Sequence, residues 1–175
     1  IKKKKTNDLF WIYQQQAEIA HEQQQYLQSY EINKKIYNLA DSLGKTEEKR
    51  IALNNLGYAA RYAEQMDEAE QFFQASLNMN PAGKDDIMRA QLLQSLGILK
   101  QNKQDYKQAV FYLDEAALLY KKVSDQEDEA RIYNFLALVY YQNGDNYRAM
   151  ASCKKAILLS QKNKYNLILV DTKYE

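Results

Sequence analysis

The side chains with the greatest chemical reactivity in this sequence are isolated from one another. His21 is the single histidine and Cys153 the single cysteine among 175 residues. Acid–base catalysis, nucleophilic catalysis or zinc binding would each need several such side chains that converge on one point. We therefore predict no catalytic residue, no metal ligand and no cofactor, and we expect that the protein is not an enzyme. We interpret His21 as an exposed polar side chain and Cys153 as a buried one.

Two short segments resemble ligand-binding loops but lack residues that such loops require. Gly44-Lys45-Thr46 matches the end of a phosphate-binding loop, which needs a further glycine where this chain has Leu39. Ser124–Glu129 is polar and acidic but lacks the glycine and the alternating ligands of a calcium loop. We interpret Gly44 as a cap at the C-terminal end of a helix. We interpret the acidic segment as the start of another helix, because acidic side chains interact favourably with the N-terminal end of a helix.

The composition argues against nucleic acid and membrane as partners. The formal net charge is +1 and the mean hydropathy is −0.69, so no general attraction to polyanions or lipid follows. The longest apolar run, Phe135 to Tyr141, is far shorter than the roughly 18 residues that span a bilayer. We interpret Lys2–Lys5 as part of a solvated basic tail over residues 1–7. A cytoplasmic protein is expected.

A helical hairpin is predicted between Leu53 and Pro81, the only proline of the chain. Apolar or small side chains recur at helical spacing in both halves of this segment, at Leu53, Leu56, Gly57 and Ala60 and then at Ala69, Phe73, Ser76 and Leu77. A glycine inside a helix costs roughly 1 kcal/mol relative to alanine, so it usually marks a place where another backbone comes close. We expect the second helix to approach Gly57 through the small side chain of Ala69.

The hairpin recurs along the chain at a step of forty residues. The recurring positions are Leu56-Gly57, Leu96-Gly97 and Leu136-Ala137, then Ala69, Ala109 and Ala149, then Phe73, Leu113 and Cys153, with a degenerate first copy at Gln16-Ala17, Ser29 and Ile36. Such self-similarity is typical of helical solenoids. We predict an all-α fold with four repeats, over residues 8–44, 45–83, 84–123 and 124–162. Residues 163–175 are expected to begin a fifth repeat or to form a capping helix.

At this spacing, Leu56-Gly57, Ala69, Phe73 and Pro81 resemble a tetratricopeptide repeat. The usual period of that repeat is about 34 residues. The longer step and the run Asn55-Leu56-Gly57 resemble the subclass found in kinesin light chains and in cell-polarity adaptors. The resemblance implies a right-handed superhelical solenoid of antiparallel helix pairs, and a general role in binding proteins or peptides.

The resemblance also implies a concave groove, lined by the first helix of each pair, that holds an extended peptide or a partner's helix. Amide side chains bind a peptide backbone through both donor and acceptor, and Tyr and Arg are enriched at interface hot spots. Asn55 is expected to contribute most, because it matches an asparagine that contacts the bound backbone in the longer-repeat subclass. The predicted groove residues are Asn54, Asn55, Tyr58, Arg61, Tyr62, Gln91, Gln94, Ser95, Ile98, Gln101, Arg131, Asn134, Phe135, Leu138 and Tyr141.

Three hypotheses follow for the function. The first is a non-enzymatic interaction module that binds a protein or peptide ligand in the concave groove. Some family members hold a chaperone's C-terminus with a clamp of lysines, asparagines and an arginine, of which only Arg131 is matched here, so that ligand is not expected. The second is a sensory or regulatory segment of a larger signalling or transcription-regulating protein, in which ligand binding changes the superhelical pitch. The third is self-association into a homo-oligomer through an uncovered apolar edge at Leu167–Val170.

Overall fold

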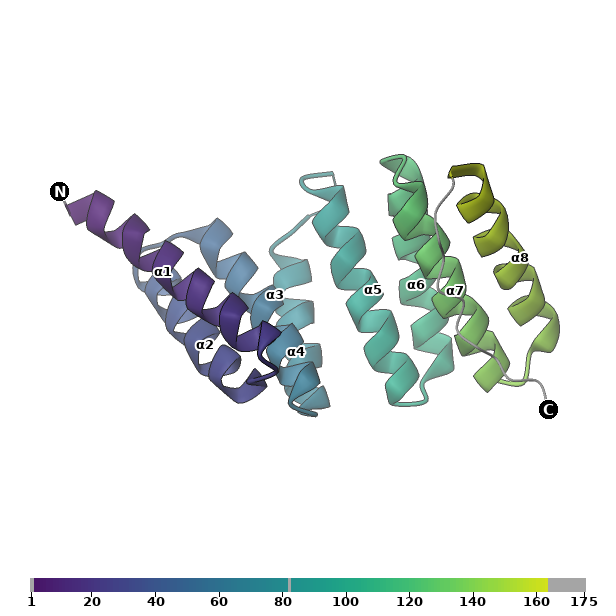
Figure 1. Cartoon of the computed structure of the whole chain (residues 1–175), viewed down its shortest axis with the longest axis horizontal. Coiled ribbons are helices and arrows are strands. Elements are labelled where there is room, and N and C mark those ends of the chain that lie inside the picture. The colour runs from purple at the N-terminus through teal and green to yellow at the C-terminus, as the bar shows by residue number, and fades with distance from the viewer. Residues whose placement is uncertain (1, 82, 164–175) are drawn as a thin grey trace. The chain divides into compact units, whose positions relative to one another are not determined.

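The predicted all-α fold is confirmed by a computed structural model that describes residues 2–81 and 83–163. Within these residues the chain forms eight helices and no strand (Figure 1). The short loops between most helices are typical of antiparallel neighbours. The helices are α1 (Lys2–Glu22), α2 (Tyr26–Ser42), α3 (Thr46–Tyr62), α4 (Met66–Asn78), α5 (Asp86–Asn102), α6 (Tyr106–Lys122), α7 (Gln126–Gln142) and α8 (Asn146–Asn163).

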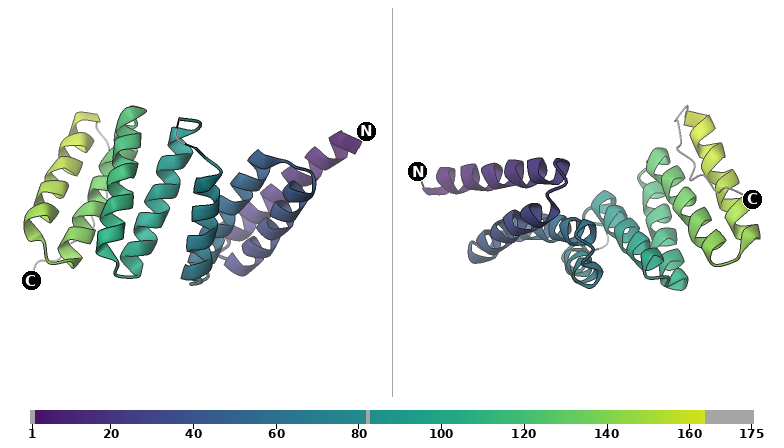
Figure 2. Two further views of the ribbon diagram at one scale, coloured as in Figure 1. Left: turned by 180° about the vertical axis from the view of Figure 1, so that it is seen from behind. Right: turned by 60° about the horizontal axis from the view of Figure 1, so that its bottom comes forward.

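The helices form four consecutive antiparallel pairs, which divide into two units between Asn80 and Pro81. The first unit contains the pairs α1/α2 and α3/α4, and the second contains α5/α6 and α7/α8. Within the first unit α2 packs against α3, and within the second α6 packs against α7, so successive pairs are stacked (Figure 2). The predicted solenoid of four helix-pair repeats is thereby confirmed. Small and apolar side chains of α1, α2 and α3 form one core cluster in the first unit, with Phe10, Ala17, Ala20, Ile32, Ile36, Ala40 and Ala52.

One buried position on the second helix of each pair determines how closely the two helices pack. We call it the plug position; it recurs every forty residues as Asn33, Phe73, Leu113 and Cys153. Phe73 and Leu113 are fully buried, whereas Cys153 is half-buried and not fully buried as the sequence suggested. A Cβ atom on Gly57 would lie 2.6 Å from Cδ1 and Cε1 of Phe73. The close approach expected at Gly57 is therefore present, but the group nearest to it is the ring of Phe73 and not Ala69.

Replacing Gly97 by alanine is expected to lower the free energy of unfolding by up to about 2 kcal/mol. A Cβ atom there would lie 2.7 Å from Cγ and 2.9 Å from Cδ2 of Leu113. Overpacking of this kind costs about 1–3 kcal/mol, and the better helix propensity of alanine returns about 1 kcal/mol. Urea unfolding followed by circular dichroism measures the effect. Gln91→Ala, an exposed change on the same helix, should stay within about 0.5 kcal/mol of the wild type, and an equal loss in both variants would contradict the packing argument.

The turns inside the helix pairs share one backbone conformation. A positive φ recurs at forty-residue spacing, with values of 60°, 63°, 59° and 79° at Gln24, Glu64, Gln104 and Gly144. After each of these residues, the next backbone N–H donates to the carbonyl five residues earlier, as from Gln65 N to Ala60 O at 2.8 Å. This is the hydrogen bonding of a Schellman motif. Because it forms with glutamine, glutamate or glycine alike, the packing of the helices sets this turn, and a glycine is not required.

The ends of several helices follow the sequence interpretation. Gly44 has a φ of 63° directly after α2, as expected of a helix cap, and Asp125 accepts a hydrogen bond from Asp128 N at the start of α7. The backbone of Lys2–Lys5 is helical, because α1 begins at Lys2, in keeping with the good helix propensity of lysine. Leu167–Val170 and the predicted fifth repeat or capping helix lie outside the described residues.

The described residues carry neither a membrane span nor a metal cluster. None of their helices combines the length and apolar character needed to cross a bilayer. Across residues 2–81 and 83–163, no three His, Cys, Asp or Glu side chains are grouped as metal ligands would be.

Candidate functional site

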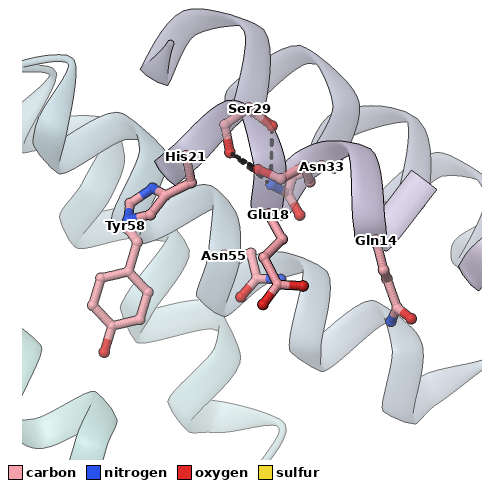
Figure 3. Close-up of a pocket in the computed structure, with 8 residues that line it drawn as sticks. Gln14, Glu18, His21, Ser29, Asn33, Asn55 and Tyr58 are labelled. Atoms are coloured by element: carbon pink, nitrogen blue, oxygen red, sulfur yellow. Dashed lines mark hydrogen bonds between the residues drawn. The ribbon is translucent and has the colours of Figure 1, made fainter. Parts of the chain in front are cut away.

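A pocket of about 360 Å³ lies in the first unit, where α1, α2 and α3 meet (Figure 3). Its walls come from the first helices of two successive pairs, and its base comes from α2. The volume is about twelve times the roughly 30 Å³ that one water molecule occupies in the liquid, so the pocket has room for a side chain or a short peptide segment. The lining residues are Gln14, Ala17, Glu18, His21, Ser29, Asn33, Asn55 and Tyr58.

The base of the pocket is polar and almost fully buried. Ser29 and Asn33 are each 2% exposed. Ser29 Oγ donates to Ala17 O at 3.1 Å, and Asn33 Nδ2 donates to Ser29 O at 2.9 Å. The remaining polar atom, Asn33 Oδ1, has no hydrogen-bond partner among the described residues, and Figure 3 shows it turned away from Ser29. A buried acceptor without a donor costs about 1–3 kcal/mol, so the free protein carries an unsatisfied polar atom at the base of the pocket.

The pocket exists because the plug of the first pair is a short polar side chain. Asn33 occupies the position that Phe73 and Leu113 fill in the second and third pairs. Ala17 stands opposite Asn33, at the position of Gly57, and its methyl group leaves less room for a larger plug. At this position the first pair therefore carries an amide, whereas the next two pairs carry apolar side chains packed against a glycine.

The walls carry hydrogen-bonding groups and one carboxylate. Asn55 and Tyr58 of α3 are half-buried, and Glu18 of α1 is exposed. Figure 3 shows the side chains of Glu18 and Asn55 extending into the same space. Gln15 Nε2 donates to Glu18 Oε2 at 3.4 Å, and Glu18 forms no salt bridge within the described part of the chain. No lysine or arginine belongs to the lining residues given above.

An aromatic cluster beside the pocket joins the end of α1 to α3. The rings of Tyr26 and Tyr62 are stacked, with centroids 4.9 Å apart and an interplanar angle of 17°. His21 meets both rings edge-on, at centroid distances of 5.5 Å and 5.2 Å. The guanidinium of Arg61 lies 4.6 Å from the centroid of Tyr62. His21 is therefore half-buried against aromatic rings, which corrects its interpretation as an exposed side chain.

The predicted groove residues of α3 occupy three different environments. Asn55 and Tyr58 line the pocket. Arg61 and Tyr62 belong to the aromatic cluster, where Tyr62 is 44% exposed. Asn54 is only 9% exposed, so it lies mainly in the interior of the unit and not on an open face.

In the second unit, several predicted groove residues are buried. Ser95 is 3% exposed and its Oγ donates to Gln91 O at 2.9 Å within α5. Gln101 is 9% exposed and its Nε2 donates to Gln142 Oε1 at 3.1 Å, which connects α5 to α7. Asn134 is also 9% exposed. The predicted residues of this unit that remain exposed or half-buried are Gln91, Gln94, Ile98, Arg131, Phe135, Leu138 and Tyr141.

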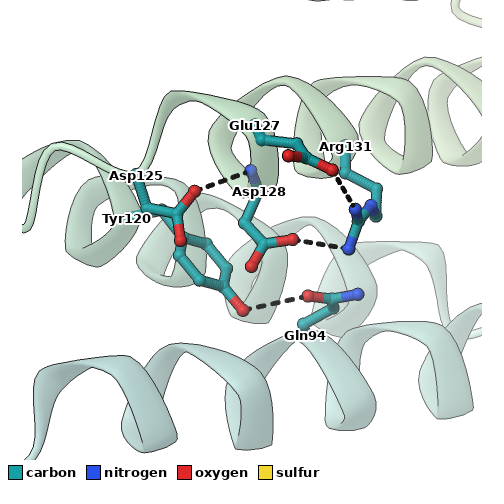
Figure 4. A network of polar contacts seen from close by, with 6 residues as sticks. All are labelled: Gln94, Tyr120, Asp125, Glu127, Asp128 and Arg131. Atoms are coloured by element: carbon teal, nitrogen blue, oxygen red, sulfur yellow. Dashed lines mark hydrogen bonds and ion pairs between the residues drawn. The ribbon is translucent and has the colours of Figure 1, made fainter. Parts of the chain in front are cut away.

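Arg131 of the second unit is engaged by carboxylates of its own helix (Figure 4). Its Nη1 lies 2.6 Å from Asp128 Oδ1, and its Nη2 lies 2.9 Å from Glu127 Oε1. Burial raises the pKa of Asp128 above its usual value, and the nearby positive charge of Arg131 opposes that rise. Across the same network Tyr120 Oη donates to Gln94 Oε1 at 3.2 Å. The guanidinium is thus balanced by two carboxylates before any acidic ligand arrives.

The pocket contains five polar or charged residues that the groove prediction omits, from α1 and α2. Three of them, Gln14, Glu18 and His21, stand forty residues before Asn54, Tyr58 and Arg61. The forty-residue step that relates the later copies could therefore have predicted these wall residues. The same step also identifies the base residues, because Ser29 and Asn33 precede Ala69 and Phe73 by forty residues.

Comparison with known families decides the classification of this fold. Residues 8–82 and residues 130–163 each match a model described as a tetratricopeptide repeat. The chain belongs to the tetratricopeptide repeat family. Such repeat domains are in general protein–protein interaction modules, and the two matches include no catalytic family. The comparison with curated proteins gave no match.

Solved tetratricopeptide-like structures share the fold at low sequence identity. BtubC (BKLC) from P. vanneervenii is 19% identical over 93% of this chain and 67% of its own, with a TM-score of 0.82. Kinesin light chain-like repeats from Podosopora anserina are 17% identical over 85% of this chain and 75% of theirs, with a TM-score of 0.73. A Rap protein complexed with competence and sporulation factor is 16% identical over 94% of this chain, which spans 45% of the Rap chain, with a TM-score of 0.78.

Proposed function

We propose that the protein is a non-enzymatic interaction module, and that the pocket between α1, α2 and α3 binds an extended segment of a peptide or partner protein. The observation that carries this proposal is a pocket of about 360 Å³ whose base holds a buried amide oxygen, Asn33 Oδ1, without a donor among the described residues. A guest that supplies an N–H group would satisfy that oxygen, so binding would remove a cost that the free protein carries.

The residue types of the pocket suit a peptide backbone. The amide of Asn55 offers both a donor and an acceptor, which matches the alternating groups of an extended chain. Tyr58 adds an apolar surface with few rotatable bonds, a property that favours interfaces. The Rap protein in complex with competence and sporulation factor gives a precedent for a bound factor on the same fold. The exposed predicted residues of α5 and α7 are proposed as further contacts for a longer partner.

Replacing Asn55 by alanine is expected to weaken peptide binding about tenfold, because the guest loses a hydrogen-bonding pair in a partly desolvated site. Random peptides displayed on phage and selected on the full wild-type chain supply the probe. Fluorescence polarisation of the selected peptides then measures the dissociation constant for each variant. Circular dichroism and urea unfolding should be unchanged.

Asn38→Ala is the matched control, since Asn38 is an exposed asparagine of α2 that does not line the pocket. It is expected to bind the selected peptides as the wild type does. Wild-type affinity in Asn55→Ala, or equal losses in both variants, would count against the pocket as the binding site.

A further inference from the structure

We propose that the pocket selects a positively charged group of its guest, a lysine or arginine side chain or a free N-terminal ammonium. This inference rests on the proposed function and adds the chemistry of the ligand to it. It is carried by the orientation of the buried polar groups at the base and by the charge on the wall.

The base of the pocket offers hydrogen-bond acceptors only. The donor side of the Asn33 amide is used, because its Nδ2 donates to Ser29 O at 2.9 Å and lies 3.4 Å from Ser29 Oγ. The hydroxyl proton of Ser29 is used as well, in the bond to Ala17 O. Asn33 Oδ1 is left without a partner among the described residues. A guest therefore has to bring donors, and an ammonium or guanidinium group brings several at once and accepts none.

The wall supplies a negative charge that would compensate the positive charge of a guest. Glu18 is the only Asp, Glu, Lys or Arg residue among those that line the pocket. Its hydrogen-bond partner, Gln15, is neutral. The nearest arginine of α3 in sequence, Arg61, lies over the ring of Tyr62 and is not part of the lining. A carboxylate guest would meet the like charge of Glu18 and the acceptor at the base, whereas a cation would meet opposite charge and that acceptor.

The ring of Tyr58 also suits a basic side chain. This ring lines the pocket, and its position is held by an edge-on contact with Phe73 at a centroid distance of 5.2 Å and an angle of 79°. The face of a tyrosine ring attracts a cation electrostatically, and the alkyl part of a lysine or arginine side chain packs against the ring. The same pocket thus accommodates both the apolar stem and the charged head of a basic side chain.

Small capped amino acids test the selection without knowledge of the natural guest. The probes are N-acetyl-lysine methylamide, N-acetyl-norleucine methylamide and N-acetyl-glutamate methylamide, titrated into the full chain and followed by NMR of the Asn33 and Asn55 side-chain amides. We expect the lysine probe to shift these signals and to bind about tenfold tighter than the norleucine probe. Glycine methylamide, compared with N-acetylglycine methylamide, tests the free ammonium in the same way, and binding by either cation supports the inference.

Glu18→Gln should remove the preference for the cationic probes, and Glu22→Gln on the same helix should retain it, because Glu22 is exposed and does not line the pocket. Equal binding within both pairs of probes, lysine against norleucine and glycine methylamide against its acetylated form, or no binding of any cationic probe, would overturn the charge selection. The interaction module itself would still stand if selected peptides bind and depend on Asn55. Failure of any peptide to bind would instead refute the proposed function.

Discussion

Filling the pocket is expected to abolish peptide binding while the protein stays folded. The variant combines Ala17→Gly with Asn33→Leu, and so copies into the first pair the Gly97 and Leu113 combination of the third. Leu113 is fully buried against Gly97, which shows that a leucine plug fits when the opposing residue is glycine. The new side chain would occupy the base of the pocket and remove the acceptor oxygen. We expect affinity for the selected peptides to fall about a hundredfold, as two or more hydrogen bonds and the space for the guest are lost.

The stability of this double variant should equal or exceed that of the wild type. Glycine at position 17 costs about 1 kcal/mol of helix propensity. Removing the unpaired Asn33 oxygen returns about 1–3 kcal/mol, and burying a leucine side chain adds a favourable term of about 1.5–3 kcal/mol. Urea unfolding tests the stability, and peptide titration tests the function on the same sample.

The single variant Asn33→Leu provides the control. With Ala17 retained, the added leucine would meet a methyl group where a Cβ on Gly97 would lie 2.7 Å from Leu113 Cγ. We expect the single variant to be less stable than the double one by about 1–3 kcal/mol. Undiminished peptide binding by a folded double variant would show that the guest binds elsewhere.

Replacing Phe73 by alanine is expected to lower the free energy of unfolding by about 3–5 kcal/mol. The side chain is fully buried, touches the position of Gly57 and supports the ring of Tyr58. Domains of ordinary stability unfold with only about 5–15 kcal/mol, so this single change should bring the first unit close to unfolding at room temperature. Urea unfolding followed by circular dichroism measures the loss.

The neighbouring Phe72 offers a comparison of the same residue type. It is only half-buried and meets the ring of Tyr30 at a centroid distance of 6.1 Å. Phe72→Ala should cost about 1 kcal/mol, the ordinary value for a point substitution. Equal losses at positions 72 and 73 would contradict the role assigned to the plug position.

The helix pairs and their repeat step follow from local information. Small residues recur at Gly57, Ala69 and their counterparts because each pair must pack two helices closely. Each repeat therefore shows this requirement in its own sequence. The sequence did not reveal which side chain fills the space against Gly57. Ala69 and Phe73 lie on the same face of α4, and only the three-dimensional packing shows that the ring of Phe73 is nearest.

The candidate site was only partly predictable for a related reason. Asn55 and Tyr58 follow from the repeat pattern and line the pocket. Asn33 was overlooked because the first copy lacks the aromatic that identifies a repeat, and the missing aromatic is what opens the pocket. Burial of Ser95 and Asn134 could not be read from their polarity, because it depends on which neighbouring helix covers them.

The shared turn conformation has a mechanical consequence. The same bonds close the turns inside the pairs and the links between stacked pairs, where Gly44 and Ser124 have φ values of 63° and 61° and Lys45 N donates to Ala40 O at 2.9 Å. The link from α2 to α3 is therefore built like the turns inside the pairs, and we expect the first unit to move as one body. A guest in the pocket would meet α1, α2 and α3 in one fixed arrangement. Little of the binding energy would then be needed to order the protein around the guest.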